Sequence, residues 1–502
     1  MNRFLTLPIL LPMLLGIGLL ILQPKSRKVR SRYVMASSLV TSALSLACVI
    51  LTYLHDSDFL ACILVSFSEV FSISLRIDGA SIVYGSIVSV LWPLVTAYSL
   101  DYMSHEGHEN RFFAFWLVAY GVVLGIAYSE DFLTLYFFYE VLTLTTLPLV
   151  MHAMDEKARY AGRKYLVYSI TGAAFAFIGM VFLLNYGVGH LNFQYGGILD
   201  KGLAAGNEEA LRLAFVAAFF GFGVKAAIFP FHGWLPDASV APPPVSALLH
   251  AVAVVKTGVF AVLRIIGFVF GPKLLADIGT ADILAWFAAG SIIISSLIAI
   301  QQDNLKRRLA FSTIGQLSYI VLGAALLSPL SIKGAYLHLV AHAVMKITLF
   351  MCAGVIIVRT HRSNISEMYG IGKKMPITMC CFTIASLGIA GMPFLIGFIS
   401  KWNLALGALQ SGKPLYVAVL IASAMLALTY LMPVCQMAYF KRDPQEQFRT
   451  YGEISYRMLL PICFTTILAL VLGVMPEISP NFYAMASQAA DSICQGWTGG
   501  GW

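Results

Sequence analysis

Five ionisable side chains stand inside long apolar runs of the sequence, where a charge is costly. They are Glu140, Lys225, Lys256, Lys346 and Lys401. Each charge at the centre of a membrane-crossing helix costs about 2.5–3.5 kcal/mol on insertion scales, so packing alone does not call for them. Burial disfavours charged lysine and a nearby carboxylate restores it, so such groups can take up and release protons. One glutamate cannot pair four lysines, which favours titratable lysines over a set of static ion pairs.

Histidines extend this set. His338, His342 and Lys346 follow one another at intervals of four residues and therefore share one face of a helix. His250 and Lys256 fall in a single apolar run, six residues apart and on different faces of the expected helix. A proton relay is the favoured interpretation, and haem or metal ligation and plain packing are the alternatives.

The amino-acid composition indicates the environment in which these residues lie. Of 502 residues, 59% are hydrophobic and only 12% are charged, and the mean hydropathy is +0.80. Soluble domains carry about 25% charged residues, so a soluble protein is excluded. The net charge of +8 does not indicate nucleic-acid binding, because the basic residues lie between apolar runs. The eight cysteines form no CxxC motif and are expected to be small buried hydrophobes rather than metal ligands.

The apolar runs predict an all-α polytopic membrane protein with about fourteen transmembrane helices. The expected helices occupy residues 4–24, 33–54, 80–100, 112–129, 132–152, 165–187, 213–234, 245–270, 283–300, 309–330, 335–358, 376–409, 416–440 and 458–476.

The distribution of lysine and arginine supports this count. Twenty-one of the 33 basic residues fall in connections after odd-numbered helices, seven fall on the opposite side with both termini, and five lie within apolar runs. One miscounted helix would destroy this alternation. By the positive-inside rule, both termini then face away from the cytoplasm. Arg264 lies near the end of its run, and we expect a snorkelling or anchoring role for it as readily as a functional one.

Two of the expected helices are interrupted in comparable ways. The seventh contains GFGVKAAIFPFHGWLPDA with Pro230, and the twelfth contains GIAGMPFLIGFISKW with Pro393, each with a lysine nearby. Paired broken helices in two halves indicate an inverted-repeat transporter whose path lies at mid-membrane. No nucleotide, flavin, quinone or iron–sulfur motif accompanies them, so we expect no cofactor and no redox or hydrolytic site. Energy then comes from an ion gradient or from a partner.

Six segments carry a resemblance to a known family. They are FFYEVLTLTTLPL (137–149), GFGVKAAIFPFHGWLPDA (221–238), SALLHAVAVVKTGVF (246–260), DNLKRRLAFSTIGQLSYI (303–320), HLVAHAVMKITLF (338–350) and GMPFLIGFISKW (391–402). In this order they resemble the proton-translocating antiporter-like membrane subunits of respiratory complex I, Mrp-type cation/proton antiporters and membrane-bound group 4 nickel–iron hydrogenases.

The resemblance implies a fold with two inverted five-helix repeats. The implied parts are N-terminal helices in 1–105, repeats in 106–272 and 273–445, and a last helix and tail in 446–502. It also implies roles by position: Glu140 and Lys225 as an ion pair, Lys256 as a connecting lysine and Lys401 as the exit-side residue. The implied relay consists of His338, His342 and Lys346, with His250 beside it.

Departures from the family pattern indicate which branch of the family the chain resembles most. Lys401 is a lysine where one complex I type carries glutamate, and no long lateral helix follows the last span. His250 resembles the larger complex I type and Lys256 the shorter ones. This mixture is most similar to the D-type Mrp subunit and its hydrogenase-associated relatives.

Three functions remain as hypotheses. The favoured one is a proton-conducting subunit of an ion-pumping complex in the cytoplasmic membrane, with other membrane subunits and in some complexes a peripheral redox module as partners. The alternatives are an independent transporter of a small solute or bicarbonate, and a structural scaffold. Redox and gradient drivers both stay open. Sodium exchange also stays open, although no cluster of carboxylates suited to Na⁺ is evident.

Overall fold

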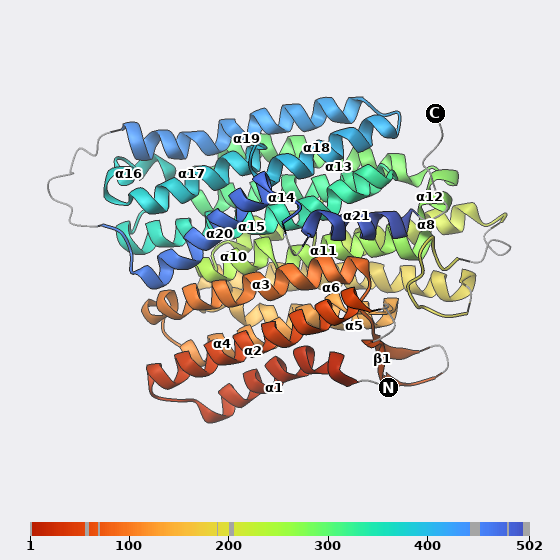
Figure 1. Ribbon diagram of the computed structural model, residues 1–502, viewed down its shortest axis with the longest axis horizontal. Coiled ribbons are helices and arrows are strands. Elements are labelled where there is room, and N and C mark those ends of the chain that lie inside the picture. Colours follow the sequence, from red (N-terminus) through yellow and green to blue (C-terminus); the bar gives the residue numbers. More distant parts are fainter. Residues whose placement is uncertain are drawn as a thin grey trace.

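The computed structural model describes residues 3–55, 60–68, 71–187, 189–199, 205–441, 452–478 and 481–494. Three of the basic residues counted in the connections, Lys201, Arg442 and Arg449, lie outside these ranges. Most described residues form long helices that run side by side in one common direction (Figure 1). This arrangement confirms the expected all-α polytopic membrane protein, because apolar helices of this length satisfy their own backbone hydrogen bonds in lipid.

The first third of the chain forms one side of the bundle. Its elements are the 3₁₀ turn η1 (Arg3–Thr6), α1 (Leu7–Leu22), α2 (Arg27–Leu54), β1 (Cys62–Ser66), β2 (Ser72–Leu75), α3 (Gly79–Tyr102), η3 (Met103–His105), α4 (Glu109–Ala127), α5 (Phe132–Val150) and α6 (Glu156–Tyr186). Aspartates cap three of these helices: Asp78, Asp131 and Asp155 accept hydrogen bonds from backbone N–H groups of α3, α5 and α6. Such caps satisfy donors that a helix start leaves free. The antiparallel hairpin of β1 and β2 was not expected from the sequence.

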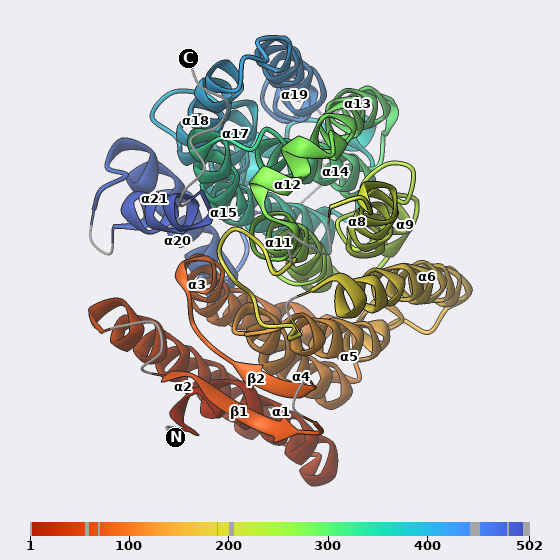
Figure 2. The same ribbon diagram turned by 90° about the vertical axis from the view of Figure 1, so that its right-hand side faces the viewer.

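The rest of the chain packs around one central helix. Its elements are α8 (Glu208–Gly223), α9 (Trp234–Ala238), α10 (Pro243–Ala251), α11 (Val254–Arg264), the π-helix η4 (Ile265–Phe270), α12 (Pro272–Asp277), α13 (Thr280–Gln301), α14 (Leu305–Ala325), α15 (Pro329–Thr360), η5 (Ile365–Glu367), α16 (Ile371–Lys374), α17 (Pro376–Ala390), α18 (Ile396–Gln410), α19 (Leu415–Phe440), α20 (Tyr456–Val474) and α21 (Phe482–Ile493). Almost all of α15 is buried, because α3, α10, α14, α17, α18, α20 and α21 pack on it (Figure 2). Polar residues on α15 therefore face protein rather than lipid.

The number of membrane crossings is not confirmed as fourteen. Helices lie in every expected segment, but by length and composition only eleven helices of the described chain are long and apolar enough to cross a membrane. Within 213–234 the helix ends at Gly223, and 376–409 is divided into α17 and α18. The segment 309–330 forms α14, which is long but carries buried polar residues such as Ser312, Gln316 and Ser318.

Both proline-marked segments are broken where the sequence predicts. The first break follows α8 and contains Pro230, and Ala227 within it has a positive φ of 54°. Trp234 Nε1 donates to the carbonyl oxygen of Val224 at 2.8 Å, so one carbonyl freed by the break is satisfied. The second break separates α17 from α18 and contains Pro393 and Gly391, whose φ of 94° suits glycine.

A third interruption was not expected. The run 245–270, predicted as one helix, is divided at Val252 and Ala253, where the backbone leaves the helical conformation (ψ of −100° at Ala253). His250 consequently lies on α10, whereas Lys256 lies on α11. Apolar residues occupy this junction, so composition alone does not reveal it.

The connections predicted to share the basic side lie together. Arg30 of α2 pairs with Glu109 of α4 at 2.6 Å, and Asp237 after the first break pairs with Lys164 at 2.7 Å and Arg307 at 3.4 Å. The starts of α2, α4, α6 and α14 therefore occupy one end of the bundle. The N-terminal end of α1 and the C-terminal end of α21 lie at the opposite end, on the right in Figure 1.

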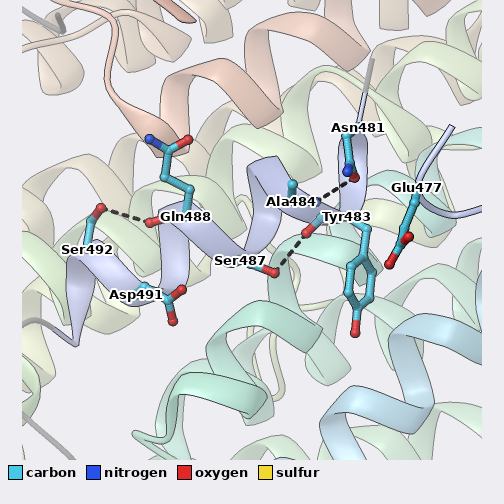
Figure 3. A pocket seen from close by; sticks show the side chains of 8 residues that line it. All are labelled: Glu477, Asn481, Tyr483, Ala484, Ser487, Gln488, Asp491 and Ser492. Carbon is cyan, nitrogen blue, oxygen red and sulfur yellow. Dashed lines mark hydrogen bonds between the residues drawn. The ribbon is translucent and has the colours of Figure 1, made fainter. Parts of the chain in front are cut away.

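Helix α21 is an addition to the expected elements. It packs against α3 and α15, and a cavity of about 640 Å³ lies along its polar face (Figure 3). The cavity is lined by Glu477, Asn481, Tyr483, Ala484, Ser487, Gln488, Asp491 and Ser492. The buried face of α21 approaches α3 closely, since a Cβ at Gly79 of α3 would stand 3.1 Å from the Cα of Ala489 on α21. No residue of the predicted relay borders this cavity.

Candidate functional site

The predicted ion pair is present as a geometric pair. Lys225 Nζ lies 3.6 Å from Glu140 Oε1; the lysine side chain is 1% exposed and that of the glutamate 27%. Lys225 also donates a hydrogen bond to the carbonyl oxygen of Tyr139, and its ammonium lies 3.4 Å from the centre of the Tyr139 ring. A cation over an aromatic face is attracted electrostatically. The buried Lys225 ammonium thus interacts with the Glu140 carboxylate, the Tyr139 carbonyl oxygen and the Tyr139 ring.

The break after α8 places Lys225 at this position. Lys225 lies just beyond the last residue of α8, Gly223, at the start of the irregular segment. Gly258 of α11 packs directly on this segment, since a Cβ there would stand 2.3 Å from the Ala226 nitrogen and 2.7 Å from the Lys225 carbonyl carbon. Only glycine permits this approach. The contact joins α11, the helix that also carries Lys256, to the backbone of the segment that carries Lys225.

Lys256 and His250 lie deep in the protein on adjacent helices. Both are fully buried, and among the described residues no group accepts a hydrogen bond from Lys256 Nζ or pairs with either ring nitrogen of His250. The His250 ring stacks on Phe350 with centroids 4.7 Å apart. Both side chains lie within electrostatic range of Lys346 on α15.

The face predicted on α15 continues the series. Lys346 donates to Ser312 Oγ at 2.7 Å and to the Leu309 carbonyl oxygen at 3.1 Å, both on α14. The ring centroids of His338 and His342 are 6.3 Å apart, and His342 has no hydrogen-bond partner among the described residues. His342 lies within electrostatic range of both Lys256 and Lys346. The two histidines and the lysine are fully buried.

Lys401 closes the series at the second break. His338 Nδ1 lies 2.9 Å from Ser400 Oγ, next to Lys401 on α18. Lys401 Nζ donates to the carbonyl oxygens of Ile389 (2.6 Å) and Ala390 (3.2 Å), which end α17. Helix C-termini carry partial negative charge and unpaired carbonyls, so they suit an ammonium group. Gly391 makes room, because a Cβ there would stand 2.9 Å from Lys401 Cδ.

The structure places the eight predicted residues in two neighbouring groups, which are together called the buried series below. The Glu140–Lys225 pair lies at α5 and the first break, the other six residues lie on α10, α11, α15 and α18, and the packing of Gly258 on the Lys225 segment joins the two groups. The residues are Glu140, Lys225, Lys256, His250, Lys346, His342, His338 and Lys401, and Pro230 and Pro393 lie in the two breaks. Imidazole and amine groups are the side chains that can take up and release protons.

Several contributors were missed from the sequence. Tyr139, Ser312 and Ser400 hold the charged groups, and the Tyr319 ring lies 4.9 Å from Lys401 Nζ and stacks on His338 at 5.1 Å. Hydroxyl and aromatic residues are common in membrane helices, so only their contacts distinguish them.

Lys306 is a further residue missed, since the sequence analysis counted it only among the basic residues of the connections. It lies in the first turn of α14 and donates to the Ala241 carbonyl oxygen at 3.0 Å. It is within electrostatic range of His250, which belongs to the buried series, and of Glu106.

Arg264 has a different role from the one expected. Its guanidinium forms a bidentate ion pair with Asp78, the cap of α3, and donates to Ser81 Oγ at 2.9 Å. The side chain is 1% exposed, so it does not snorkel to the surface. Burial raises the pKa of Asp78, but Arg264 and Ser81 lower it more, and the net pKa lies below the ordinary value. This pair joins α11 to α3 and is not part of the series.

Metal ligation finds no support in the geometry of the described residues. Within them, no three histidine, cysteine, aspartate or glutamate side chains converge on a point that could hold an ion. His338 and His342 instead face a serine and neighbouring lysines.

The fold and the buried series define a class of protein: polytopic helical membrane proteins with ionisable groups buried inside the helix bundle. Residues 129–429 match the family described as "NADH:quinone oxidoreductase/Mrp antiporter, TM", and residues 66–113 match "NADH-Ubiquinone oxidoreductase (complex I), chain 5 N-terminus". The chain is 36% identical over 384 residues to "NADH-quinone oxidoreductase subunit N" of Desulforudis audaxviator (strain MP104C), with 74% of this chain and 75% of that one covered. The chain belongs to the family of antiporter-like membrane subunits, which confirms the resemblance.

Solved structures share the whole fold. One chain of the membrane-bound sulfane sulfur reductase, an archaeal respiratory membrane complex, superposes with a TM-score of 0.86 at 22% identity, covering 98% of each chain. One chain of the Mrp complex from Dietzia sp. DQ12-45-1b superposes with a TM-score of 0.85 at 20% identity, again covering 98% of each chain. At this identity the likeness concerns the fold.

Proposed function

We propose that the chain is a proton-conducting, antiporter-like membrane subunit of a multi-subunit ion-pumping complex. The observation that carries this proposal is the buried series itself: a Glu140–Lys225 pair that continues into lysines and histidines without a carboxylate for each. Fully buried ionisable groups in membrane helices mark ion paths and proton relays.

The unpaired groups indicate how protons move between members. Within the described chain, Lys256 Nζ, His338 Nε2 and both ring nitrogens of His342 lack protein partners. Buried polar atoms of this kind bind ordered water, which bridges them. A proton then passes between amines and imidazoles through water, and Lys225 releases or takes up its proton as its distance to Glu140 changes.

Partners supply the energy in this proposal. The relatives are named as subunits of quinone oxidoreductases and antiporters, and the structural neighbours come from multi-subunit complexes. We therefore place other membrane subunits beside this chain, with a peripheral redox module or a Na⁺ or K⁺ gradient as driver. The identities of the neighbouring genes distinguish these drivers.

The orientation and the division of the chain are also proposals. We place the protein in the cytoplasmic membrane with both termini outside, because the basic connections gather at one end of the bundle. We assign 106–272 and 273–445 to the two inverted repeats, between N-terminal helices in 1–105 and a last part in 446–502. One proline-containing break falls in each repeat.

A reconstitution experiment tests the proposed function. The intact complex in sealed vesicles should acidify or alkalinise the lumen when its driver is supplied, as a pH-sensitive dye reports. The isolated chain should show no NADH oxidation, no hydrogen turnover and no coupled exchange, because it lacks the driver. Coupled exchange by the isolated chain would favour an independent transporter of a small solute or bicarbonate.

A further inference from the structure

A groove of about 1070 Å³ opens at the basic end of the bundle, away from the buried series. It lies between the N-terminal parts of α2 and α20 and the C-terminal half of α3. Its lining consists of Arg27, Lys28, Ser31, Arg32, Met35, Leu94, Ala97, Leu100, Asp101, Tyr456, Arg457, Leu460, Pro461, Cys463, Phe464 and Ile467. Helices α2 and α20 are both candidate membrane spans, so the groove extends from the membrane surface toward its interior.

The outer rim of the groove is positively charged. Four basic side chains border it, and the one acidic side chain in the lining, Asp101, already accepts hydrogen bonds from Arg27 (3.3 Å) and Ser455 (2.5 Å). Lys28, Arg32 and Arg457 remain exposed. Both α2 and α20 begin at this rim, and helix N-termini add partial positive charge. The rim therefore suits a phosphate group.

The inner wall of the groove is apolar. Leu460, Phe464 and Ile467 follow one another along α20 and are 62%, 50% and 58% exposed. Leu94 of α3 and Met35 of α2 complete the wall. The stretch of α20 from Arg457 to Ile467 measures about 15 Å at 1.5 Å per residue, which is half of the hydrocarbon core. This wall suits an acyl chain that enters from the basic end.

We propose that this groove binds one anionic phospholipid of the bilayer. The headgroup phosphate lies among Arg32, Arg457 and Lys28, and an acyl chain lies along Leu460, Phe464 and Ile467. Basic pockets between membrane helices on the cytoplasmic side are suited to anionic headgroups. A free phosphate would leave the apolar wall unused, so the ligand is a lipid. The site is independent of proton conduction, because no member of the buried series borders it.

The test uses the intact complex in nanodiscs of phosphatidylcholine with one quarter phosphatidylglycerol. A photoreactive benzoylphenylalanine replaces Leu460, and mass spectrometry identifies what the irradiated chain captures. We expect a phosphatidylglycerol adduct far above its share of the lipid. A polypeptide adduct instead would show that the groove is a contact with a neighbouring subunit, and a phosphatidylcholine adduct in proportion would show an unselective surface. Either outcome overturns the proposal.

Variants measure the role of the charged rim. Arg32→Gln with Arg457→Gln should lower the phosphatidylglycerol adduct about twenty-five-fold, since each basic side chain near an anionic headgroup contributes on the order of fivefold. The matched control, Arg159→Gln with Arg163→Gln on the exposed face of α6 at the same end, should leave the adduct unchanged. Inorganic phosphate at millimolar concentration should not compete. Equal loss in the control pair, or displacement by phosphate alone, would contradict a built lipid site.

Discussion

Glu140 and Lys225 approach each other to 3.6 Å, just beyond hydrogen-bond range, while the lysine ammonium is hydrogen-bonded to the carbonyl oxygen of Tyr139. The carboxylate and the ammonium thus interact through charge across a short gap. Their attraction depends strongly on protonation state and on small movements, because Coulomb energy in a buried site is screened only weakly. Such a pair is suited to opening and closing during transport.

The first prediction concerns this carboxylate. Glu140→Gln keeps the shape and removes the charge, so Lys225 loses its counter-charge in a buried site. We expect proton uptake into sealed vesicles to fall about tenfold or more, since an unpaired buried charge costs about 3–5 kcal/mol and shifts the lysine toward its neutral form. Glu208→Gln, on the exposed first turn of α8, is the matched control and should pump normally.

The second prediction concerns the proton on Lys225. Lys225→Arg should abolish coupled uptake although the complex assembles, because arginine does not deprotonate in proteins. Lys413→Arg, at the surface pair with Asp282, should have no such effect. Normal uptake by Lys225→Arg would refute the deprotonation step and leave the pair a structural salt bridge. The exchanged pair, Glu140→Lys with Lys225→Glu, is expected to recover part of the activity.

The third prediction ranks the members of the series on α15. Lys346→Ala should slow pumping more than His338→Ala or His342→Ala, because water can bridge a missing imidazole but cannot replace a charged group. Ser312→Ala removes one of the two acceptors of Lys346 and should give an intermediate rate. The rates come from dye-monitored uptake at equal amounts of assembled complex. Loss of pumping in both histidine variants with an intact Lys346→Ala variant would reverse this ranking.

The fourth prediction tests the close approach of α11 to the first break. Gly258→Ala introduces a Cβ 2.3 Å from the backbone nitrogen of Ala226, and backbone atoms on both sides must shift. We expect a loss of stability of about 1–3 kcal/mol, as for other overpacked sites, and slower proton uptake. Gly290→Ala on α13 is the control, since nothing lies within 4 Å of its Cβ position. Thermal unfolding in detergent and vesicle uptake measure the two effects; equal behaviour of the two variants would contradict the tight contact.

The fifth prediction concerns stability at acid pH. His152, beyond the end of α5, has a pKa lowered from 6.5 to about 4, chiefly by burial and further by Arg111. The unfolded chain binds a proton there below about pH 6.5 and the folded chain does not, so the free energy of unfolding should fall between pH 6.5 and 4. The contribution should reach about 1–2 kcal/mol after allowance for partial hydration. His152→Gln should flatten this part of the pH profile, and the exposed His105→Gln should not.

The prediction of the breaks shows how far sequence reasoning reaches. Pro230 and Pro393, with their neighbouring glycines, marked both irregular segments correctly, because proline removes a helical hydrogen bond wherever it stands. The interruption at Val252 and Ala253 has no such signal. It depends on the packing of α10 and α11 against other helices, and apolar residues accept either conformation.

Arg264 illustrates the same limit for a charged residue. Hydropathy located Arg264 near the end of an apolar run. That position fits an anchor at the membrane surface as well as a buried ion pair. Its partner Asp78 stands far away in the sequence, at the start of α3. Only the packing of α11 on α3 decides between the two roles.

The sequence by itself determined the class of protein and the segments that hold most of its helices. It also singled out eight ionisable residues, because burying charge in hydrocarbon is costly enough to stand out in any apolar run. It also determined that His338, His342 and Lys346 share a face, since helix geometry sets that spacing. Only the tertiary structure decided which groups accept hydrogen bonds from the lysines. Lys225 donates to the Tyr139 carbonyl oxygen, Lys346 donates to Ser312, and Lys401 donates to a carbonyl oxygen at the end of α17. These partners come from other helices, and their contacts arise from side-chain packing that no local pattern encodes.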